Sequence, residues 1–326
     1  MNTLIRTIAM AVFGAAILAA MPARAADGYP AKQIHIVVPF PPGGSIDMVT
    51  RLIGQKLSEG FDKPVVVSNR PGASGNIGME YVARAPADGY TLVLAPFSVA
   101  TASHLFLKLP FDPLKDLKPI IRVADQPNVL VVNADKVKAN SVKELVAHLK
   151  AHPDELSFGT SGIGNPQDFS ARTFMVATGT KMLNVAYKGG APALSDLMGG
   201  HIDLMFETSP TAVPYVLGGK LKALAVTSDK RLSTLPDVPT LDEAGITGYK
   251  AIYWMGLLAS GKTPQPIIEK LNAEVRKILA TSSVRKQIEE ISLYPGGGTP
   301  EEFGDLIRSE SAIYARLIED LDIPRQ

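Results

Sequence analysis

Short apolar runs alternate with segments of helical periodicity along most of the chain. Runs of this kind, rich in Val, Ile, Leu and Phe and bounded by turn residues, predict β-strands. The runs are continuously apolar, as expected of a parallel sheet covered by helices on both faces. Together with the alternation of strands and helices, this predicts an α/β fold. The predicted strands are residues 34–40, 65–67, 91–95, 129–133, 185–187, 202–206 and 221–227.

Several helix starts are marked by a hydroxyl residue followed by Glu or Pro. Residues 141–144 form a capping-box pattern, and Thr263 and Thr299 each precede a proline that is compatible with a first helical turn. We therefore expect two long helices in the C-terminal part of the chain.

At 326 residues, the chain is longer than one core usually organises, which favours two lobes. No linker rich in Pro, Gly or Ser separates them, so we expect the chain to cross between lobes more than once. The crossings are expected near residues 125–131 and 225–228. The first lobe then comprises residues 27–127 plus 228–326, and the second comprises residues 128–227.

The first 26 residues have the pattern of a secretory signal peptide. Arg6 precedes an apolar run over residues 8–20, and residues 23–25 (ARA) match a cleavage site, so we expect cleavage near Ala25. A membrane anchor is the alternative, but the run is shorter than the roughly 20 apolar residues that span a bilayer.

Composition excludes several classes of function. Apolar residues make up 46% of the chain and charged residues 20%, as in an ordinary globular protein. Without residues 1–25 the chain carries 31 basic and 32 acidic residues, a formal charge of −1, so we expect no nucleic-acid partner. Cysteine is absent, which excludes disulfides, thiolate metal sites and a cysteine nucleophile. We expect no metal, no cofactor and no catalytic residues.

Four loops rich in Gly, Ser, Thr and Asn lead from predicted strands into helices. Such loops lie at the carboxyl ends of strands, where free N–H groups and the positive helix end favour an anion. Glycine lets the backbone approach the ligand, and hydroxyls at Ser45, Ser74, Thr160 and Ser161 would add donors. The alternative is ordinary capped turns. The loops are residues 41–47, 71–76, 159–166 and 188–192, the last beginning at Lys188.

Acidic and amide groups stand close to the same strand and helix ends. Asp47 suits the first turn of a helix, and it could also organise water or a polar ligand group. Gln167, Asp168 and Glu207 would either cap helices or accept hydrogen bonds from a ligand hydroxyl or amine.

Three patterns that suggest catalysis or metal binding lack their context. Residues 256–263 (GLLASGKT) match a phosphate-binding loop, but residues 257–259 end a predicted strand and Pro264 follows at once. His148 and His152 have a zinc-compatible spacing without the glutamate of a zinc protease, and both suit the end of a helix. No serine has the spacing of a nucleophile elbow.

Seven motifs, distributed over nearly the whole chain after the signal peptide, are together highly specific. They are residues 29–32 (YPAK), 38–47 (VPFPPGGSID), 69–78 (NRPGASGNIG), 88–91 (DGYT), 187–189 (YKG), 223–227 (ALAVT) and 235–240 (LPDVPT). In these motifs the chain resembles the Bug-type receptors of tripartite tricarboxylate transporters.

The resemblance implies a type II periplasmic binding protein fold, two lobes that close on a small organic anion, and delivery of that ligand to the permease subunits of a membrane transporter. We expect a periplasmic monomer without enzymatic activity. Ligands of the family are mostly carboxylates, held by backbone amides, hydroxyls and waters. By matching position, the binding residues would be Gly43, Gly44, Ser45, Asp47, Ser74, Gly75 and Asn76 in the first lobe and Thr160, Ser161, Gly162, Asn165 and Gln167 in the second.

The pocket segments depart from the pattern of many relatives. Residues 165–168 (NPQD) replace a Ser/Thr-Ser-His sequence, Glu207 replaces an aspartate, and residues 95–98, ending in Ser98, replace a glycine or threonine stretch. Phe97 would favour an aromatic acid, with packing as the alternative, and the same choice applies to Trp254. Two other functions remain open: a ligand-sensing partner of a membrane kinase, and a periplasmic hydrolase.

Overall fold

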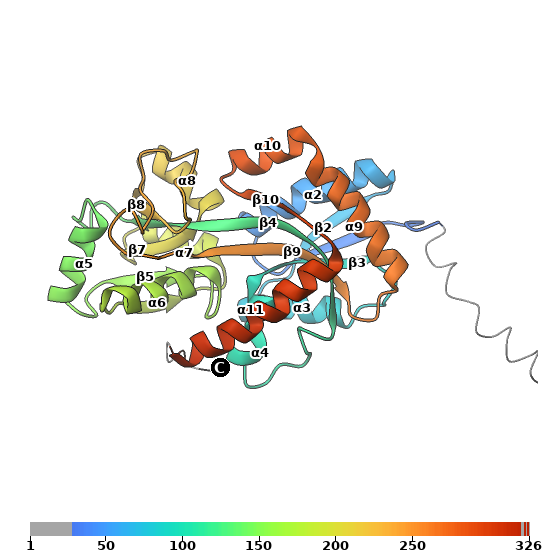
Figure 1. The fold of residues 1–326 in the computed structure, drawn as a ribbon, viewed down its shortest axis with the longest axis horizontal. Helices are drawn as coiled ribbons and strands as arrows, with labels where there is room; N and C mark the ends of the chain where they lie inside the picture. The colour runs from blue at the N-terminus through green and yellow to red at the C-terminus, as the bar shows by residue number, and fades with distance from the viewer. Residues whose placement is uncertain (1–27, 321–322, 324, 326) are drawn as a thin grey trace, which may run out of the picture.

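The computed structural model describes residues 28–320, 323 and 325 (Figure 1). The predicted signal peptide lies outside these residues. The strands are β1 (Ile34–Val38), β2 (Val65–Asn69), β3 (Thr91–Pro96), β4 (Leu117–Val132), β5 (Ser157–Thr160), β6 (Leu183–Ala186), β7 (Leu204–Thr208), β8 (Lys222–Val226), β9 (Ile252–Ser260) and β10 (Tyr294–Gly297). The helices are α2 (Ser45–Phe61), α3 (Asn76–Ala83), α4 (Ala102–Leu105), α5 (Val142–Ala151), α6 (Pro166–Thr178), α7 (Gly190–Met198), α8 (Ser209–Leu217), α9 (Gln265–Ala280), α10 (Ser282–Glu290) and α11 (Pro300–Asp320), with 3-10 turns η2 (Ala73–Gly75) and η3 (Phe97–Ala100).

The α/β fold is confirmed, but the sheet is mixed rather than parallel. Its strand order is β2-β1-β3-β9-β4-β7-β5-β6, and β8 and β10 also pair with β4. The outer strands are parallel to their neighbours, as predicted. The central strands β4 and β9 run antiparallel to β3, β7 and to each other, so the prediction was wrong at the centre.

Two long strands connect the two halves of the molecule. Figure 1 shows β4 and β9 passing between a half that holds β1, β2 and β3 and a half that holds β5 and β7. The first part of β4 pairs with β9, and its last five residues pair with β7. At the change of partner, the Asn128 N–H donates to Thr227 Oγ1 over 2.8 Å. Both positions where we expect the chain to cross therefore lie side by side.

Each half has apolar clusters on both faces of its sheet, which explains the continuously apolar strands. In β1, Ile36 packs with α2 and α9, whereas Val37 packs with α3 and α11. In β4, Leu130 packs with α5 and α6, whereas Val131 packs with α7 and α8. Two lobes, each a helix-covered sheet, follow from this packing.

The segment between β8 and β9 packs on the half that holds β5 and β7. Leu232 and Leu235 belong to the cluster of α7 and α8, and Leu241 and Tyr249 belong to the cluster of α5 and α6. These contacts favour a lobe boundary later in the chain than residue 227. The residue boundaries of the lobes stay a prediction.

Two of the three predicted helix starts have the predicted caps. The prediction at Thr263 was wrong, because α9 begins at Gln265 after Pro264, and the buried Thr263 Oγ1 makes no hydrogen bond with a described residue. Ser141 Oγ accepts from the Glu144 N–H over 3.2 Å. At α11, Thr299 Oγ1 accepts from the Glu302 N–H and Glu302 Oε2 accepts from the Thr299 N–H, which is a complete capping box. None of the helices between residues 28 and 320 has both the length and the apolar content that crossing a bilayer requires.

Candidate functional site

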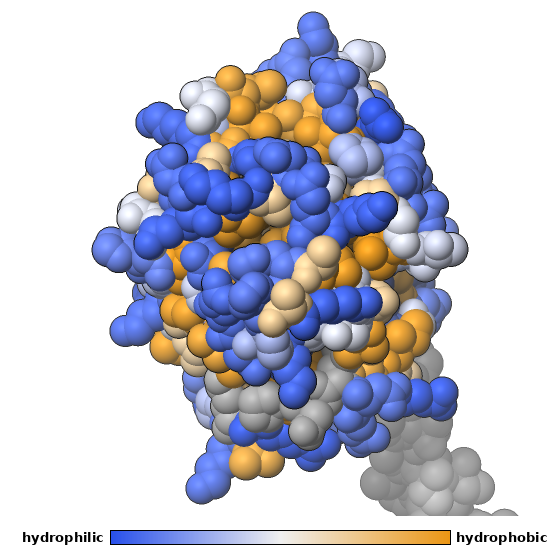
Figure 2. Space-filling model, turned by 90° about the vertical axis from the view of Figure 1, so that its left-hand side faces the viewer, coloured by the Kyte–Doolittle hydropathy of each residue, from blue (hydrophilic) through white to orange (hydrophobic). Residues whose placement is uncertain are grey.

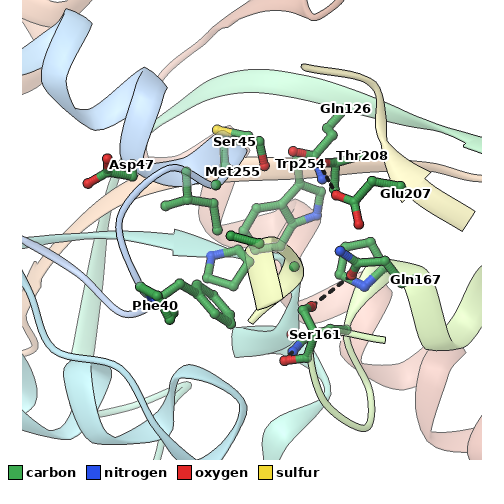
Figure 3. A pocket seen from close by; sticks show the side chains of 18 residues that line it. Phe40, Ser45, Asp47, Gln126, Ser161, Gln167, Glu207, Thr208, Trp254 and Met255 are labelled. Atoms are coloured by element: carbon green, nitrogen blue, oxygen red, sulfur yellow. Dashed lines mark hydrogen bonds between the residues drawn. The ribbon is translucent and has the colours of Figure 1, made fainter. Parts of the chain in front are cut away.

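A pocket lies between the two halves, where several helices begin. It encloses about 570 Å³ of space between atoms, part of it open to solvent. The first turns of α2, α6 and α7 and the residue before α8 border it, and the central strands β4 and β9 form its back. The lining residues are Phe40, Pro41, Gly44, Ser45, Ile46, Asp47, Pro96, Gln126, Ser161, Asn165, Pro166, Gln167, Gly190, Ala191, Glu207, Thr208, Trp254 and Met255 (Figure 3).

Asp47 fixes the loop before α2 rather than facing the pocket centre. Its carboxylate accepts from the Gly43 N–H at 3.2 Å, from Asn69 Nδ2 at 2.9 Å and from Arg51 at 2.9 and 3.0 Å. Figure 3 shows the carboxylate turned away from the other labelled side chains. Burial raises the pKa of Asp47, but the hydrogen bonds from Arg51, Asn69 and Gly43 outweigh it and lower that pKa overall. Asp47 is therefore an ionised brace for this loop.

On the opposite wall, the start of α6 presents amide donors. Ser161 Oγ donates to Gln167 Oε1 over 2.8 Å, which leaves the Gln167 NH₂ group directed at the pocket (Figure 3). Asn165 Nδ2 donates to the Ser161 carbonyl over 3.2 Å and holds the loop. These bonds orient the Gln167 NH₂ group as a donor toward the pocket, where it lies beside the Glu207 carboxyl.

Glu207 is a buried carboxyl at the end of β7, 1% exposed. Its Oε1 accepts from the hydroxyls of Thr208 and Thr211. Its Oε2 is buried and makes no hydrogen bond with any described residue. Burial raises the pKa of Glu207 and outweighs the lowering effect of the Thr211 and Thr208 hydroxyls and the Gln167 amide.

The pocket has no cationic lining residue: its described lining includes no Lys, Arg or His. Positive potential comes instead from helix starts, whose first N–H groups have no intrahelical acceptor. Those of α2 come from one half and those of α6, α7 and α8 from the other. Gly190, the first residue of α7, has no side chain to keep a ligand away from its backbone. This arrangement can hold a small anion without an ion pair.

Comparison with known proteins identifies the family. The profile described as "Tripartite tricarboxylate transporter family receptor" matches residues 49–323. The chain belongs to this receptor family. BugT of Bordetella pertussis is 36% identical to the receptor over 297 residues, which cover 90% of this chain and 91% of BugT. A protein of Pseudomonas sp. strain P51, described as lying in the tcbD-tcbE intergenic region, is 35% identical over 293 residues, 90% of this chain and 87% of that protein.

Solved structures give the same result. An R. palustris protein described with adipate is 35% identical, covers 91% of the receptor and all of its own chain, and superposes with a TM-score of 0.88. MatC from Rhodopseudomonas palustris, described with bound malate, is 30% identical, covers 89% of the receptor and all of its own chain, and has a TM-score of 0.83. The periplasmic binding protein BugD, at 32% identity, covers 91% of the receptor and all of its own chain, with a TM-score of 0.86. The receptor is therefore a Bug-type solute-binding protein with the type II periplasmic binding protein fold.

Three of the four predicted loops border the pocket of the receptor, and the fourth lies at the seam between its halves. That fourth loop is residues 71–76. A Cβ added at Gly162 would lie 2.5 Å from Ser74 Oγ, so the two loops touch. The Gly75 N–H donates to the Gly72 carbonyl over 3.0 Å, and the side chain of Asn76 is buried with no hydrogen-bond partner among the described residues.

Other predicted residues support the pocket walls from outside. Asp168 is fully buried and accepts from the Gly164 N–H, Arg172 and Asn184. Burial raises the pKa of Asp168, against the opposing effect of Arg172 and these hydrogen bonds. The remaining predicted residues that do not line the pocket are Gly43, whose N–H is taken by Asp47, Thr160 and Ser98, which are buried, and Lys188, which is exposed. As ligand contacts, all of these stay predictions.

The aromatic residues divide between packing and lining. Phe97 is 1% exposed and packs against Phe169, Tyr253, Trp254 and Tyr314, outside the pocket lining. Trp254 lines the pocket, and its Nε1–H donates to Glu310. The ring of Trp254, not its N–H group, is therefore the part that a ligand meets.

Sequence reasoning missed several lining residues. Gln126 lies in β4, within the segment where a crossing between lobes was expected, and Met255 lies in β9. Thr208 is the residue before α8, a helix start without a glycine-rich loop. Phe40 lies just after β1. Gln126, a polar residue within the segment where a crossing was expected, was the one available signal.

Proposed function

We propose that the receptor captures a small organic anion, a mono- or dicarboxylate, in the pocket between its lobes and delivers it to the permease subunits of a tripartite tricarboxylate-type transporter. It does so in the periplasm, as a monomer, by lobe closure and without chemistry on the ligand. The observation that carries the proposal is the convergence of helix starts from both halves on a pocket whose lining has no cationic side chain.

The energetics favour an anion. Each helix N-terminus stabilises a negative charge by about 0.3–1 kcal/mol when exposed and by more when partly buried. Gln167 and Ser45 add neutral donors. Relatives described with adipate and with malate support a carboxylate, and the ring of Trp254 in the lining would allow contact with an aromatic acid of the same class.

A thermal-shift screen tests the proposal. Adipate, malate, other mono-, di- and tricarboxylates and aromatic acids are added to the receptor, and the melting temperature is recorded. A ligand at about 100 times its Kd stabilises the folded state by roughly 2.7 kcal/mol, so at least one acid should raise the melting temperature clearly. If no acid raises it, the proposal fails.

A matched pair of glycine variants locates the site. A Cβ at Gly190 would lie 3.3 Å from Glu207 Oε1 inside the pocket, whereas a Cβ at Gly199, at the other end of α7, would lie 3.1 Å from the side chain of His201. We expect Gly190→Ala to weaken binding of the best acid about tenfold, roughly 1.4 kcal/mol, as measured by calorimetry. Gly199→Ala should leave the affinity unchanged, and equal effects of the two variants would contradict this site.

A further inference from the structure

Glu207 places an acidic group in a pocket that is proposed to bind an anion. It lines the pocket, is 1% exposed, and has one oxygen occupied by two threonine hydroxyls. The other oxygen, Oε2, is buried and has no hydrogen-bond partner among the described residues. Buried polar atoms in native proteins are nearly always paired, so a free oxygen in a ligand pocket indicates a ligand contact.

The elements packed around Glu207 bring no charge to it. Opposite it on β4 is Val129, α6 contributes Gln167, α7 begins with Gly190, and α8 contributes Thr211. None of these side chains titrates.

Across the pocket, the titratable group that lines the wall is Asp47, whose carboxylate is bound by Arg51 and Asn69. An ionised Glu207 would therefore face an anionic ligand with no cation between them.

We propose that Glu207 holds a proton when the pocket closes on its anionic ligand, and that Oε2–H donates a hydrogen bond to a ligand carboxylate oxygen. Binding then takes up one proton from solvent onto Glu207. The inference rests on the proposed function, because it requires an anionic ligand in this pocket.

Closure supplies the driving force. In an open, hydrated pocket a glutamate has a pKa near its ordinary value of about 4.3 and is ionised at neutral pH. Burial in the closed pocket raises the pKa of Glu207, and a ligand anion beside it acts in the same direction. A protonated Glu207 can donate a hydrogen bond from Oε2 to the ligand, and it no longer repels the ligand carboxylate. Binding and protonation are thus coupled, and each favours the other.

The first test needs no variant. Titration calorimetry with adipate, or with the acid that binds best in the screen, is run above about pH 6.5, where simple carboxylates are fully ionised. Repeating it in buffers of different ionisation enthalpy counts the protons taken up. We expect an uptake approaching one proton, and a Kd that rises about tenfold for each pH unit.

Two variants assign that proton. Glu207→Gln has nearly the same shape, keeps a neutral donor and cannot titrate, so it should bind with no proton uptake and a flat pH dependence. Glu310→Gln is the control, because Glu310 is another carboxyl whose pKa burial raises, it lies outside the pocket lining, and a glutamine oxygen can still accept from the Nε1–H of Trp254. It should keep the proton uptake of the unmodified receptor.

The outcomes separate this inference from the proposed function. Binding without proton uptake, or a Glu207→Gln variant that keeps the pH slope, overturns the inference alone and indicates an ionised Glu207 that accepts from a ligand hydroxyl or amine. Absence of binding by every acid at every pH overturns both. If Glu207→Gln does not fold, the proton count of the unmodified receptor still decides.

Discussion

Two carboxyl groups line one pocket and have opposite environments. Asp47 receives hydrogen bonds from Arg51, Asn69 and the Gly43 N–H, so its charge is favoured. Glu207 accepts from two threonine hydroxyls and lies beside the Gln167 amide, but its burial outweighs these neutral donors, so its charge is disfavoured. The first acid shapes the anion-binding loop from behind, and the second faces the space where the ligand would lie. The same residue class therefore braces a loop at one wall and, as proposed, contacts the ligand at the other.

Replacement of Asp47 tests its role as a brace. We expect Asp47→Ala to lose about 2 kcal/mol of unfolding free energy near neutral pH, since it leaves the Gly43, Arg51 and Asn69 donors without their acceptor. The pKa of Asp47 is lowered in the fold, so its contribution is present above the unfolded value of about 3.9 and is lost as the pH falls through the folded value. Urea unfolding at pH 7 and near pH 3 should therefore show that the difference in unfolding free energy between variant and parent is smaller at the lower pH.

The control for that experiment lies on the same helix. Glu59 pairs with Lys56 at 2.8 Å, and its side chain is 53% exposed. Exposed ion pairs of this kind contribute little, so Glu59→Ala should change stability far less than Asp47→Ala and leave ligand binding unchanged. A loss as large as that of Asp47→Ala, or a gap that stays constant with pH, would contradict the bracing role.

At the scale of single elements, the starts of several helices border the pocket. The α2 helix begins at Ser45, which lines the pocket, and its first N–H groups are free of intrahelical acceptors. Such a terminus stabilises any negative charge placed there, whether it belongs to a ligand or to the protein itself. A carboxylate built into the first turn should therefore compete with the ligand.

The variant Ser45→Asp separates ligand binding from stability. We expect it to lower carboxylate affinity at least about tenfold, because the introduced carboxylate repels the ligand and occupies the N-terminus of α2. The melting temperature without ligand should stay level or rise, because an acid is favourable in the first turn of a helix. Ser282→Asp makes the same change at the exposed start of α10 and should leave affinity unchanged. Calorimetry and thermal unfolding measure the two effects. A Ser45→Asp variant that binds as well as its parent would refute an anion site at α2.

An element can be predicted from the sequence when residues close to it in the chain determine its structure. Caps such as Ser141 and Thr299, and the loops before α2, α6 and α7, could be predicted because a few neighbouring residues determine them. Most strands were found within a few residues. The antiparallel course of β4 and β9 could not be predicted, because periodicity gives a strand its face but not its direction. The β10 strand, with its sequence YPGG, has no strand signal and exists through pairing with β4.

The pocket itself was harder to predict than its loops. Loop composition indicates a helix start, but only the tertiary arrangement decides whether that start faces the pocket. Residues 71–76 have the same glycine-rich pattern as residues 41–47, yet they lie at the seam against Gly162. The start of α8 has no glycine-rich loop, yet Thr208 lines the pocket.

At the scale of the whole molecule, the two halves touch along a seam beside the pocket. A Cβ at Gly189 would lie 2.7 Å from Pro41 of the other half, and Thr101 Oγ1 donates to the Gly164 carbonyl over 3.3 Å. Glycine recurs on this seam because the backbones of the two walls come too close for a side chain to fit between them.

The outer surface that Figure 2 shows mixes polar and apolar residues over the half that holds β5 and β7. The proposed opening would have to separate these seam contacts and the packing of Phe169 against Phe97 and Tyr314, while β4 and β9 keep the halves connected.

Lobe closure predicts a ligand-dependent change in distance between the edges of the sheet. The chain has no cysteine, so introduced cysteines can carry spin labels without background. Val66 on β2 and Leu183 on β6 stand at opposite ends of the strand order and are 41% and 51% exposed. In pulsed electron paramagnetic resonance, Val66→Cys with Leu183→Cys should give a broad distance distribution without ligand and a narrower, shifted one with a saturating acid, since the ligand favours one state. The pair Leu183→Cys with Leu217→Cys lies within one half and should not change. Identical distributions with and without a bound acid would mean that the receptor binds in a pocket that is already closed.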